Sequence, residues 1–158
     1  MKFFVILHSQ NNPKVLIGRI IAIDYGQKRV GLAVTDVEQI IATSLTTVRA
    51  MDAIPFLKDY VSREPVVLFL VGEPRQMNNQ ASESARFIEP FVKLLKKTFP
   101  DIPVERVDER FTSKMALSAM REAGLKKKDR ENKSLVDTVS ATIILQSYLD
   151  QLSYRGKN

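Results

Sequence analysis

The stretch RIIAIDYGQKRVGLAV, residues 19–34, decides the predicted fold of this chain. Its apolar residues 20–23 run directly into Asp24, and the chain then turns at Gly26 into a second apolar run, residues 30–34. Two β-rich runs joined by a short glycine-containing turn are typical of a β-hairpin, and glycine suits the turn because it can adopt positive φ. The sequence therefore predicts a buried strand that ends in a carboxylate.

The remainder of the sequence predicts a mixed sheet with helices on both faces. A third strand is expected at residues 40–48, and the almost wholly apolar PVVLFLVG predicts a strand covered on both faces, as in parallel sheets. Apolar residues at helical spacing indicate four helices, at residues 52–64, 81–99, 112–124 and 134–152, and a fifth strand at residues 103–110. This α/β order matches the ribonuclease H-like architecture, a mixed five-stranded sheet.

The length of the chain, 158 residues, is that of one domain. We expect residues 1–17 to be a flexible N-terminal extension, residues 18–152 to form the ribonuclease H-like domain and residues 153–158 to be a C-terminal tail. An added edge strand is the alternative for the last residues of the extension. The apolar run at residues 3–7 is far shorter than the roughly 20 residues of a membrane span.

The composition favours a polyanionic partner. The chain carries 24 Lys and Arg against 18 Asp and Glu, a formal net charge of +6. This excess suits nucleic acid, although charge alone also suits an anionic membrane surface. Cysteine is absent, which excludes disulfides, thiolate zinc sites and cysteine nucleophiles and fits a cytoplasmic protein.

Carboxylates gather at the ends of the predicted strands. The first strand ends in Asp24, the fourth in Glu73 and the fifth in Asp108 and Glu109, and the first turn of the last helix contains Asp137. Ligands of open sheets bind beyond strand ends, so acids from separate elements are expected to converge there. Carboxylates without His or Cys suit Mg²⁺ or Mn²⁺, and two such ions can activate water at a phosphodiester and stabilise the leaving oxygen.

These residues also have purely structural explanations. Asp24 could open an Asx turn in the hairpin, and Asp137 lies three residues after Ser134, as in a capping box with Asp in place of Glu. Glu109 could pair with a neighbouring arginine on the surface. Tyr25 could stack on a base, although a hairpin tyrosine more often packs locally. The sequence leaves these alternatives open.

Cations close to the same acids are candidates for binding a nucleic-acid backbone. Lys28 and Arg29 lie in the hairpin, Arg75 follows the fourth strand, Arg110 follows the fifth, and KKKDRENK, residues 126–133, is expected to be a basic loop between the last two helices. Phosphate contacts mostly position a nucleic acid and carry little sequence information. Cations scattered over the surface without a common role are the alternative.

Four segments follow one another along the chain: IAIDYGQKRVGLAVTD, VGEP, VDERFTS and SLVDTVSATIILQSYL. Together they resemble the YqgF family, also described as RuvX-like Holliday junction resolvases and pre-16S rRNA nucleases, over residues 19–150. The resemblance implies a nuclease domain whose catalytic and metal-binding acids are Asp24, Glu109 and Asp137, with Mg²⁺ or Mn²⁺ as cofactor. Glu73 stands where the family often has an apolar residue, and we regard it as an auxiliary acid.

The resemblance implies a metal-dependent nuclease, a hydrolase acting on ester bonds in structured nucleic acid. The expected role is processing of the 5′ end of pre-16S rRNA in ribosome biogenesis. Branched DNA such as a Holliday junction is the alternative substrate, for which a homodimer would supply the two active sites that symmetrical cleavage needs. A non-catalytic nucleic-acid-binding protein is the alternative class. Sugar-kinase-like phosphotransfer requires two such domains around ATP, and this chain is too short for both.

Overall fold

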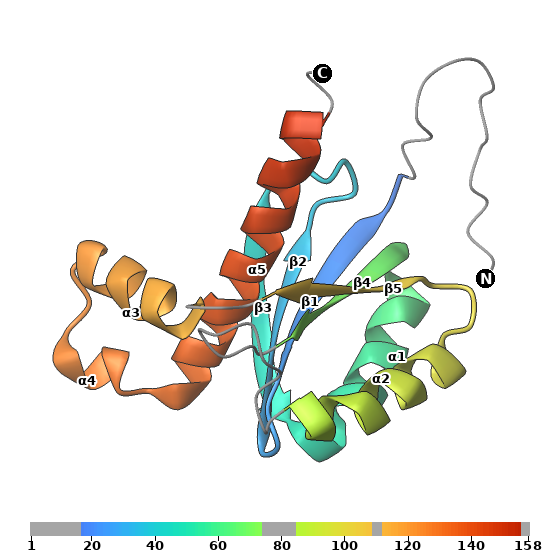
Figure 1. Ribbon diagram of the computed structural model, residues 1–158, viewed down its shortest axis with the longest axis horizontal. Coiled ribbons are helices and arrows are strands. Elements are labelled where there is room, and N and C mark those ends of the chain that lie inside the picture. The colour runs from blue at the N-terminus through green and yellow to red at the C-terminus, as the bar shows by residue number, and fades with distance from the viewer. Residues whose placement is uncertain (1–16, 74–84, 109–111, 156–158) are drawn as a thin grey trace.

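The computed structural model describes residues 17–73, 85–108 and 112–155 (Figure 1). The strands are β1 (Arg19–Tyr25), β2 (Arg29–Thr35), β3 (Ala42–Arg49), β4 (Val66–Glu73) and β5 (Val104–Asp108). The helices are the 3₁₀ helix η1 (Ala50–Asp52), α1 (Ala53–Arg63), α2 (Ala85–Thr98), α3 (Thr112–Glu122), α4 (Lys127–Arg130) and α5 (Lys133–Arg155). The predicted extension, apart from its last residue, lies outside the described residues.

The five strands form one mixed sheet in the order β3-β2-β1-β4-β5. Strands β1, β2 and β3 are antiparallel neighbours, whereas β4 runs parallel to both β1 and β5. The central strand is β1, whose residues 20–23 are all buried because both faces of the sheet are covered. This arrangement confirms the mixed five-stranded sheet predicted from the sequence.

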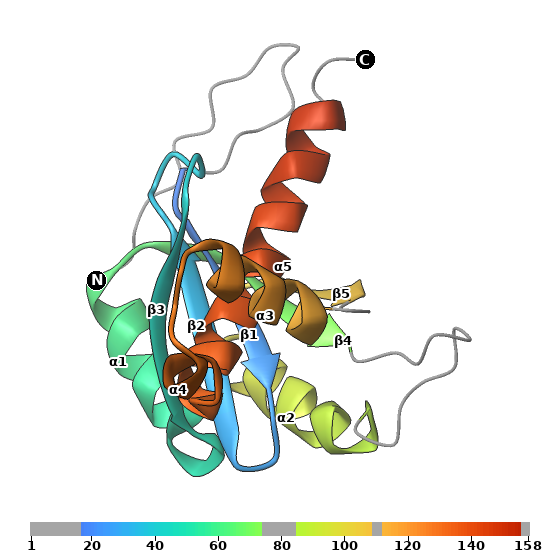
Figure 2. The same cartoon turned by 90° about the vertical axis from the view of Figure 1, so that its left-hand side faces the viewer.

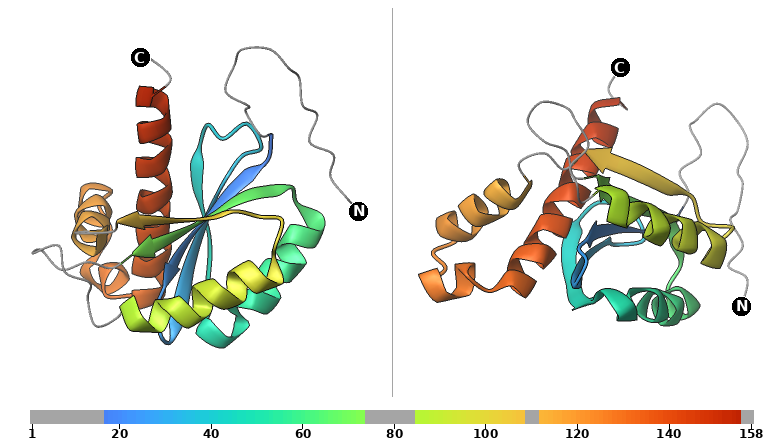
Figure 3. Two further views of the ribbon diagram at one scale, coloured as in Figure 1. Left: turned by 45° about the vertical axis from the view of Figure 1, so that its right-hand side comes forward. Right: turned by 60° about the horizontal axis from the view of Figure 1, so that its bottom comes forward.

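Two apolar cores lie on opposite faces of the sheet. Helices α1 and α2 cover one face of the sheet (Figure 3). There Ile21 and Ile23 of β1 belong to one buried apolar cluster with Leu57 of α1 and Leu95 of α2. Helix α5 covers the other face, where Ala22 belongs to a cluster with the buried apolar residues of that helix. Alternate residues of β1 therefore serve two different cores, which explains why its apolar run is unbroken.

Helices α3 and α4 lie beside α5, on the side away from α1 and α2 (Figures 1 and 2). They contact α5 and make no comparable contact with the sheet. Within the described ranges, no helix is both long and apolar enough to span a membrane.

Three local predictions from the sequence need correction. The expected basic loop contains the short helix α4, and helix α5 continues to Arg155, so the boundary predicted at residue 153 falls inside a helix. Gly26 does not adopt positive φ. Glycine is instead needed there because a Cβ would lie 2.7 Å from the carbonyl oxygen of Arg29, whose own bond to the Gly26 N–H closes the turn at 2.8 Å.

Candidate active site between strand β1 and helix α5

Asp24 faces helix α5 from the end of the central strand. Side chains alternate along a strand, so Asp24 shares its face with Ile20 and Ala22, both of which belong to the core beneath α5. Across the hairpin, Asp24 is paired with Gly31 of β2. Directly opposed residues have their Cβ positions about 5 Å apart, so whatever lies over Gly31 lies next to the Asp24 carboxylate.

The segment over Gly31 is the backbone of Asp137 in α5. A Cβ added at Gly31 would lie 2.2 Å from the carbonyl oxygen of Asp137, a distance that real Cβ atoms do not reach. Only glycine lets the helix approach the strand this closely. The structure thus brings Asp24 and Asp137, two of the three predicted acids, to one place although they are far apart in the sequence.

Arg29 holds the side chain of Asp137. Its Nε donates a hydrogen bond of 2.9 Å to Asp137 Oδ2, and the two side chains are 34% and 25% exposed. Arg29 and Gly31 lie two residues apart on β2 and so face the same side of the sheet. Because Gly31 has no side chain, the guanidinium can reach the helix beside it. Arg29, predicted from the sequence as a phosphate contact, is thus engaged by a carboxylate of this chain.

Asp137 is not the capping residue that one alternative expected. Helix α5 begins at Lys133, two residues earlier than that alternative requires, and the N–H of Leu135 donates to Oδ1 of Asn132 at 3.3 Å. This bond is the N-cap contact, made by the residue before the helix. Asp137 therefore lies in the second turn, where Arg29 binds its carboxylate.

A row of hydroxyl groups forms hydrogen bonds between α5 and strand β3. Thr47 Oγ1 donates a hydrogen bond of 2.7 Å to the carbonyl oxygen of Ser134, and the hydroxyls of Ser44 and Thr142 are 3.0 Å apart. These bonds lie on either side of Asp137 along the helix. They restrict both sliding and rotation of α5, so the position of the carboxylate is fixed by three strands, β1, β2 and β3.

Replacing Thr47 with valine should weaken this attachment without disturbing the strand. The change removes the bond to the carbonyl oxygen of Ser134 and the contact with the hydroxyl of Thr138, which together cost about 1 to 2 kcal/mol of unfolding free energy. Urea denaturation would measure the loss. Thr43→Val is the control, because Thr43 is exposed on the same strand and valine favours strands at either position. Equal stability of the two variants would contradict the proposed role of the hydroxyl row.

Glu73 and Asp108 lie away from Asp24. Glu73 follows Phe69 and Val71 on alternate positions of β4, and these residues belong to the core beneath α1 and α2. Asp108 is the residue of β5 that lies opposite Glu73 in the parallel register. It comes four residues after Val104, which packs on the same core. Alternation therefore directs both acids to the face opposite Asp24 and α5.

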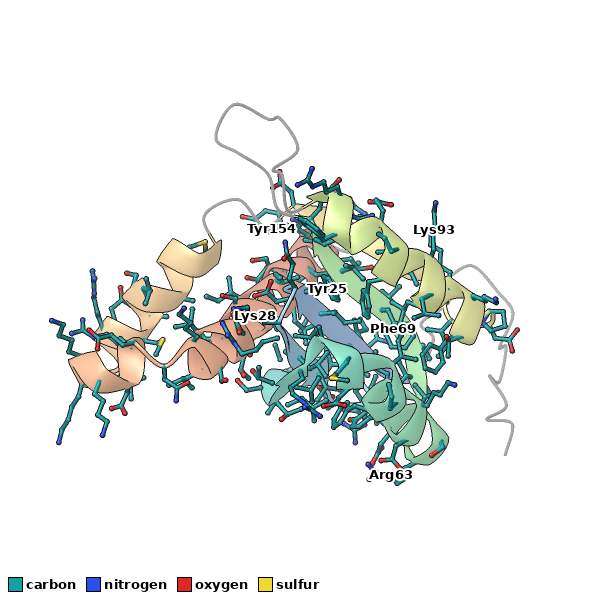
Figure 4. The ribbon with its side chains drawn as sticks, turned by 90° about the horizontal axis from the view of Figure 1, so that it is seen from below. Tyr25, Lys28, Arg63, Phe69, Lys93 and Tyr154 are labelled. Atoms are coloured by element: carbon teal, nitrogen blue, oxygen red, sulfur yellow. The ribbon has the colours of Figure 1, made fainter. Side chains whose placement is uncertain are left out.

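The hairpin supplies one packed aromatic ring and one exposed cation. The ring of Tyr25 stacks on Phe91 of α2 with centroids 4.4 Å apart, so this tyrosine packs locally, as the structural alternative expected. Lys28 lies at the end of the hairpin and is exposed (Figure 4). Its amine is free to meet a charged partner near the site, whereas Tyr25 is occupied by the core.

Three predicted site residues, Glu109, Arg75 and Arg110, lie outside the described residues. Within the described ranges, no group of three or more His, Cys, Asp or Glu side chains is arranged to hold a metal ion. The two acids that are described offer carboxylate oxygens, the donors that a hard divalent cation prefers, and the backbone of Asp137 lies over Gly31, the residue opposite Asp24. A third acid at the end of β5 is the donor that the prediction requires.

Asp36, far from this site, has a structural role. Oδ1 of Asp36 accepts bonds of 2.8 Å from the N–H groups of both Ile40 and Ile41, and Oδ2 accepts one of 3.1 Å from Glu38. The bond from the Ile41 N–H is the main cause that lowers the pKa of the Asp36 carboxyl, since it favours the ionised form. Asp36 thus orders the loop between β2 and β3.

The sequence of this chain is similar to those of a known protein family. A family model described as RuvX, Holliday junction resolvase, matches residues 18–151. A protein of Phocaeicola vulgatus is 62% identical over 138 residues, which cover 87% of this chain and 99% of the relative. A protein of Flavobacterium psychrophilum is 59% identical over 131 residues, covering 83% of this chain and 96% of the relative. Both carry the provisional name pre-16S rRNA nuclease.

The fold is shared with solved structures of much lower sequence similarity. Thermus thermophilus RuvC in complex with a Holliday junction substrate superposes with a TM-score of 0.51 at 18% identity, covering 85% of this chain and 96% of that chain. A second structure of Thermus thermophilus RuvC gives a TM-score of 0.50 at 16% identity. At these identities the likeness supports the ribonuclease H-like fold and nothing finer.

Proposed function

Because this chain belongs to the RuvX family, whose description is Holliday junction resolvase, we propose that it is a nuclease that processes the 5′ end of pre-16S rRNA. It would hydrolyse phosphodiester bonds in structured RNA, in the cytoplasm, during ribosome biogenesis. The substrate follows from the provisional name of relatives about 60% identical. The observation in the chain itself that carries the proposal is the meeting of Asp24 and Asp137 over Gly31.

Three acids of this site would hold the metal ion that hydrolysis requires. Asp24 follows directly on the buried residues 20–23 of the central strand, so its backbone is held rigidly. Asp137 is held by its helix and by Arg29, and we propose Glu109 as the third acid. These acids would hold Mg²⁺ or Mn²⁺, which when bound supplies an activated water and charge stabilisation for the leaving oxygen.

Cations around the acids would position the nucleic acid. Lys28 is exposed at the hairpin and could contact a phosphate directly. We also propose Arg75 and Arg110 as phosphate contacts, because each follows a strand whose carboxyl end lies at the same edge of the sheet as Asp24. Arg29 differs from them, since its Nε is already bonded to Asp137.

A cleavage assay with three substrates tests the proposed function. A pre-16S rRNA leader, an unstructured RNA and a four-way DNA junction would be incubated with Mn²⁺, with Mg²⁺ or with EDTA. We expect metal-dependent cleavage of the leader and a fall of at least about 100-fold in Asp24→Asn, because metal-assisted charge stabilisation is worth several kcal/mol. Asp150→Asn, an exposed acid at the far end of α5, is the matched control and should cleave normally.

Two results would contradict the proposal. Cleavage by Asp24→Asn at the rate of the unaltered protein would show that the activity does not come from this site. Binding of the leader without cleavage under any metal condition would identify a non-catalytic nucleic-acid-binding protein.

Resolution of branched DNA is the second candidate function. The description of the matching family favours it. Symmetrical cleavage of a four-way junction needs two active sites, so this function would require a homodimer. Cleavage of the junction together with failure to cut the leader would select it, and sedimentation of the protein with and without the junction would then test the dimer.

A further inference from the structure

Helices α3 and α4, with the turn that leads into α5, form a basic arm, residues 112–133. Its second half is rich in cations: Arg121, Lys126, Lys127, Lys128, Arg130 and Lys133. All of these except the half-buried Arg130 are exposed. The same stretch contains three acids, Glu122, Asp129 and Glu131, so residues 121–133 carry six positive and three negative charges, a net +3 of the total +6 of the chain.

The arm begins and ends next to the candidate active site. Its first helix starts three residues after Glu109, at the carboxyl end of β5, and its last residues lead into the helix that carries Asp137. Between these two points the arm extends beyond the sheet, on the side of α5 away from α1 and α2 (Figures 1 and 3). A strand of nucleic acid bound at the acids could therefore continue along the arm.

The arm is packed and not merely a solvated loop. Ala116 and Met120 of α3 are buried, and α3 and α4 both contact α5. The turn between the helices is closed by a bond of 3.1 Å from the Leu125 N–H to the Met120 carbonyl, with Gly124 at φ +76°. The cations are thus carried on a defined surface, so the entropy lost on binding a partner would be small.

Neighbouring acids neutralise these cations only weakly. In the described part of the arm the ion pair is Lys127 Nζ to Glu131 Oε1 at 3.9 Å, with side chains 84% and 66% exposed. Pairs so exposed contribute little, because water and salt screen them. The arm therefore keeps its positive potential for a polyanion.

We propose that the basic arm binds the phosphate backbone of structured RNA beside the bond that is cut. This inference rests on the proposed function for the choice of RNA, and on the charge, exposure and position of the arm for the surface. Lys126, Lys127 and Lys128 would contact the backbone, while the phosphodiester to be hydrolysed lies next to the acids of the site. The arm would set affinity and the length of RNA bound, and would leave the chemistry unchanged.

The test compares two triple variants that remove the same charge. The first replaces Lys126, Lys127 and Lys128 with glutamine. The control replaces Lys93, Lys96 and Lys97, three exposed lysines of α2, which covers the opposite face of the sheet (Figure 4). Binding of a fluorescent hairpin from the rRNA leader would be measured by anisotropy in EDTA at several salt concentrations, and thermal melting would confirm that both variants are folded.

The slope of log K against log salt reports how many phosphates are contacted, about 0.7 to 0.9 for each contact. Because three lysines are replaced, we expect the magnitude of this slope to fall by about 2 in the arm variant. The α2 variant should keep the slope of the unaltered protein. Equal slopes in both variants would overturn the proposal. Loss of binding to a four-way DNA junction with unchanged binding to the hairpin would also overturn it, because the partner would then be branched DNA.

Cleavage separates this inference from the proposed function. The arm variant should cleave a short oligonucleotide, too short to reach the arm, at the unaltered rate. If the unaltered protein cleaves none of the substrates but the arm variant still loses RNA affinity, the proposed function fails and the binding surface stands. If cleavage is normal and RNA affinity does not depend on the arm, the binding surface fails alone.

Discussion

Gly31→Ala is expected to destabilise the protein by about 3 kcal/mol, the upper part of the range for overpacking a core. The added Cβ would lie 2.2 Å from the Asp137 carbonyl oxygen, 2.4 Å from its carbon and 3.0 Å from the Thr138 nitrogen. All three atoms belong to the backbone of α5, so no change of rotamer can relieve the contact. The helix has to move away from the sheet, and the carboxylate of Asp137 moves with it.

Gly124→Ala supplies the control for this change. Nothing lies within 4 Å of a Cβ at Gly124, but its φ of +76° makes any side chain there strained. We expect a loss of about 1 kcal/mol, the usual cost of such a conformation. Urea denaturation would compare the two variants. A smaller loss for Gly31→Ala than for Gly124→Ala would show that α5 can shift at little cost, and the argument for a fixed Asp137 would fail.

The centre of the fold could be predicted from the sequence because its signals are local. The apolar runs at residues 20–23 and 66–71 need burial on both faces, and only a covered sheet provides it. Helix α4 could not be predicted, because it lacks such a local signal. It has four residues, too few to form an apolar stripe, and its charged residues are equally typical of a loop.

The candidate site could be predicted only in part. The strand ends and the start of the last helix indicated five candidate acids, and only the family resemblance narrowed them to Asp24, Glu109 and Asp137. The pair between Arg29 and Asp137 joins residues 108 positions apart, and no spacing in the sequence indicates it. The auxiliary acids show a further limit. Strand alternation places Glu73 on the other face, but this is apparent only once the face of α5 is known.

Arg29→Gln is expected to lower cleavage by about 10- to 100-fold while changing stability by no more than about 1 kcal/mol. Residues that hold a metal ligand in place typically matter to this extent. The pair is partly exposed, with side chains 34% and 25% exposed, so water still screens it and its contribution to folding is modest. Asp137→Asn should lower cleavage further and abolish its share of Mn²⁺ binding, since hard cations depend on ligand charge.

A second Arg–Asp pair in the chain provides matched controls. Arg63 Nη2 lies 2.7 Å from Asp59 Oδ2 on α1, an exposed pair remote from Asp24. Arg63→Gln and Asp59→Asn make the same chemical changes and should leave both cleavage and Mn²⁺ affinity unaltered. Any loss that appears equally in these variants would be an effect of net charge and not of the site.

The double variant Arg29→Gln/Asp137→Asn decides how Arg29 acts. If the guanidinium works by holding Asp137, its removal should matter little once that carboxylate is gone, so the two losses will not add. The loss in Arg29→Gln alone should then appear in kcat and in Mn²⁺ affinity measured by titration calorimetry. If Arg29 instead binds a phosphate of the substrate, its loss should appear in KM, grow weaker with added salt, and persist undiminished in the Asp137→Asn background. That outcome would show that Arg29 binds phosphate, as predicted from the sequence. Its bond to Asp137 would then exist only in the free protein and would be broken when substrate binds.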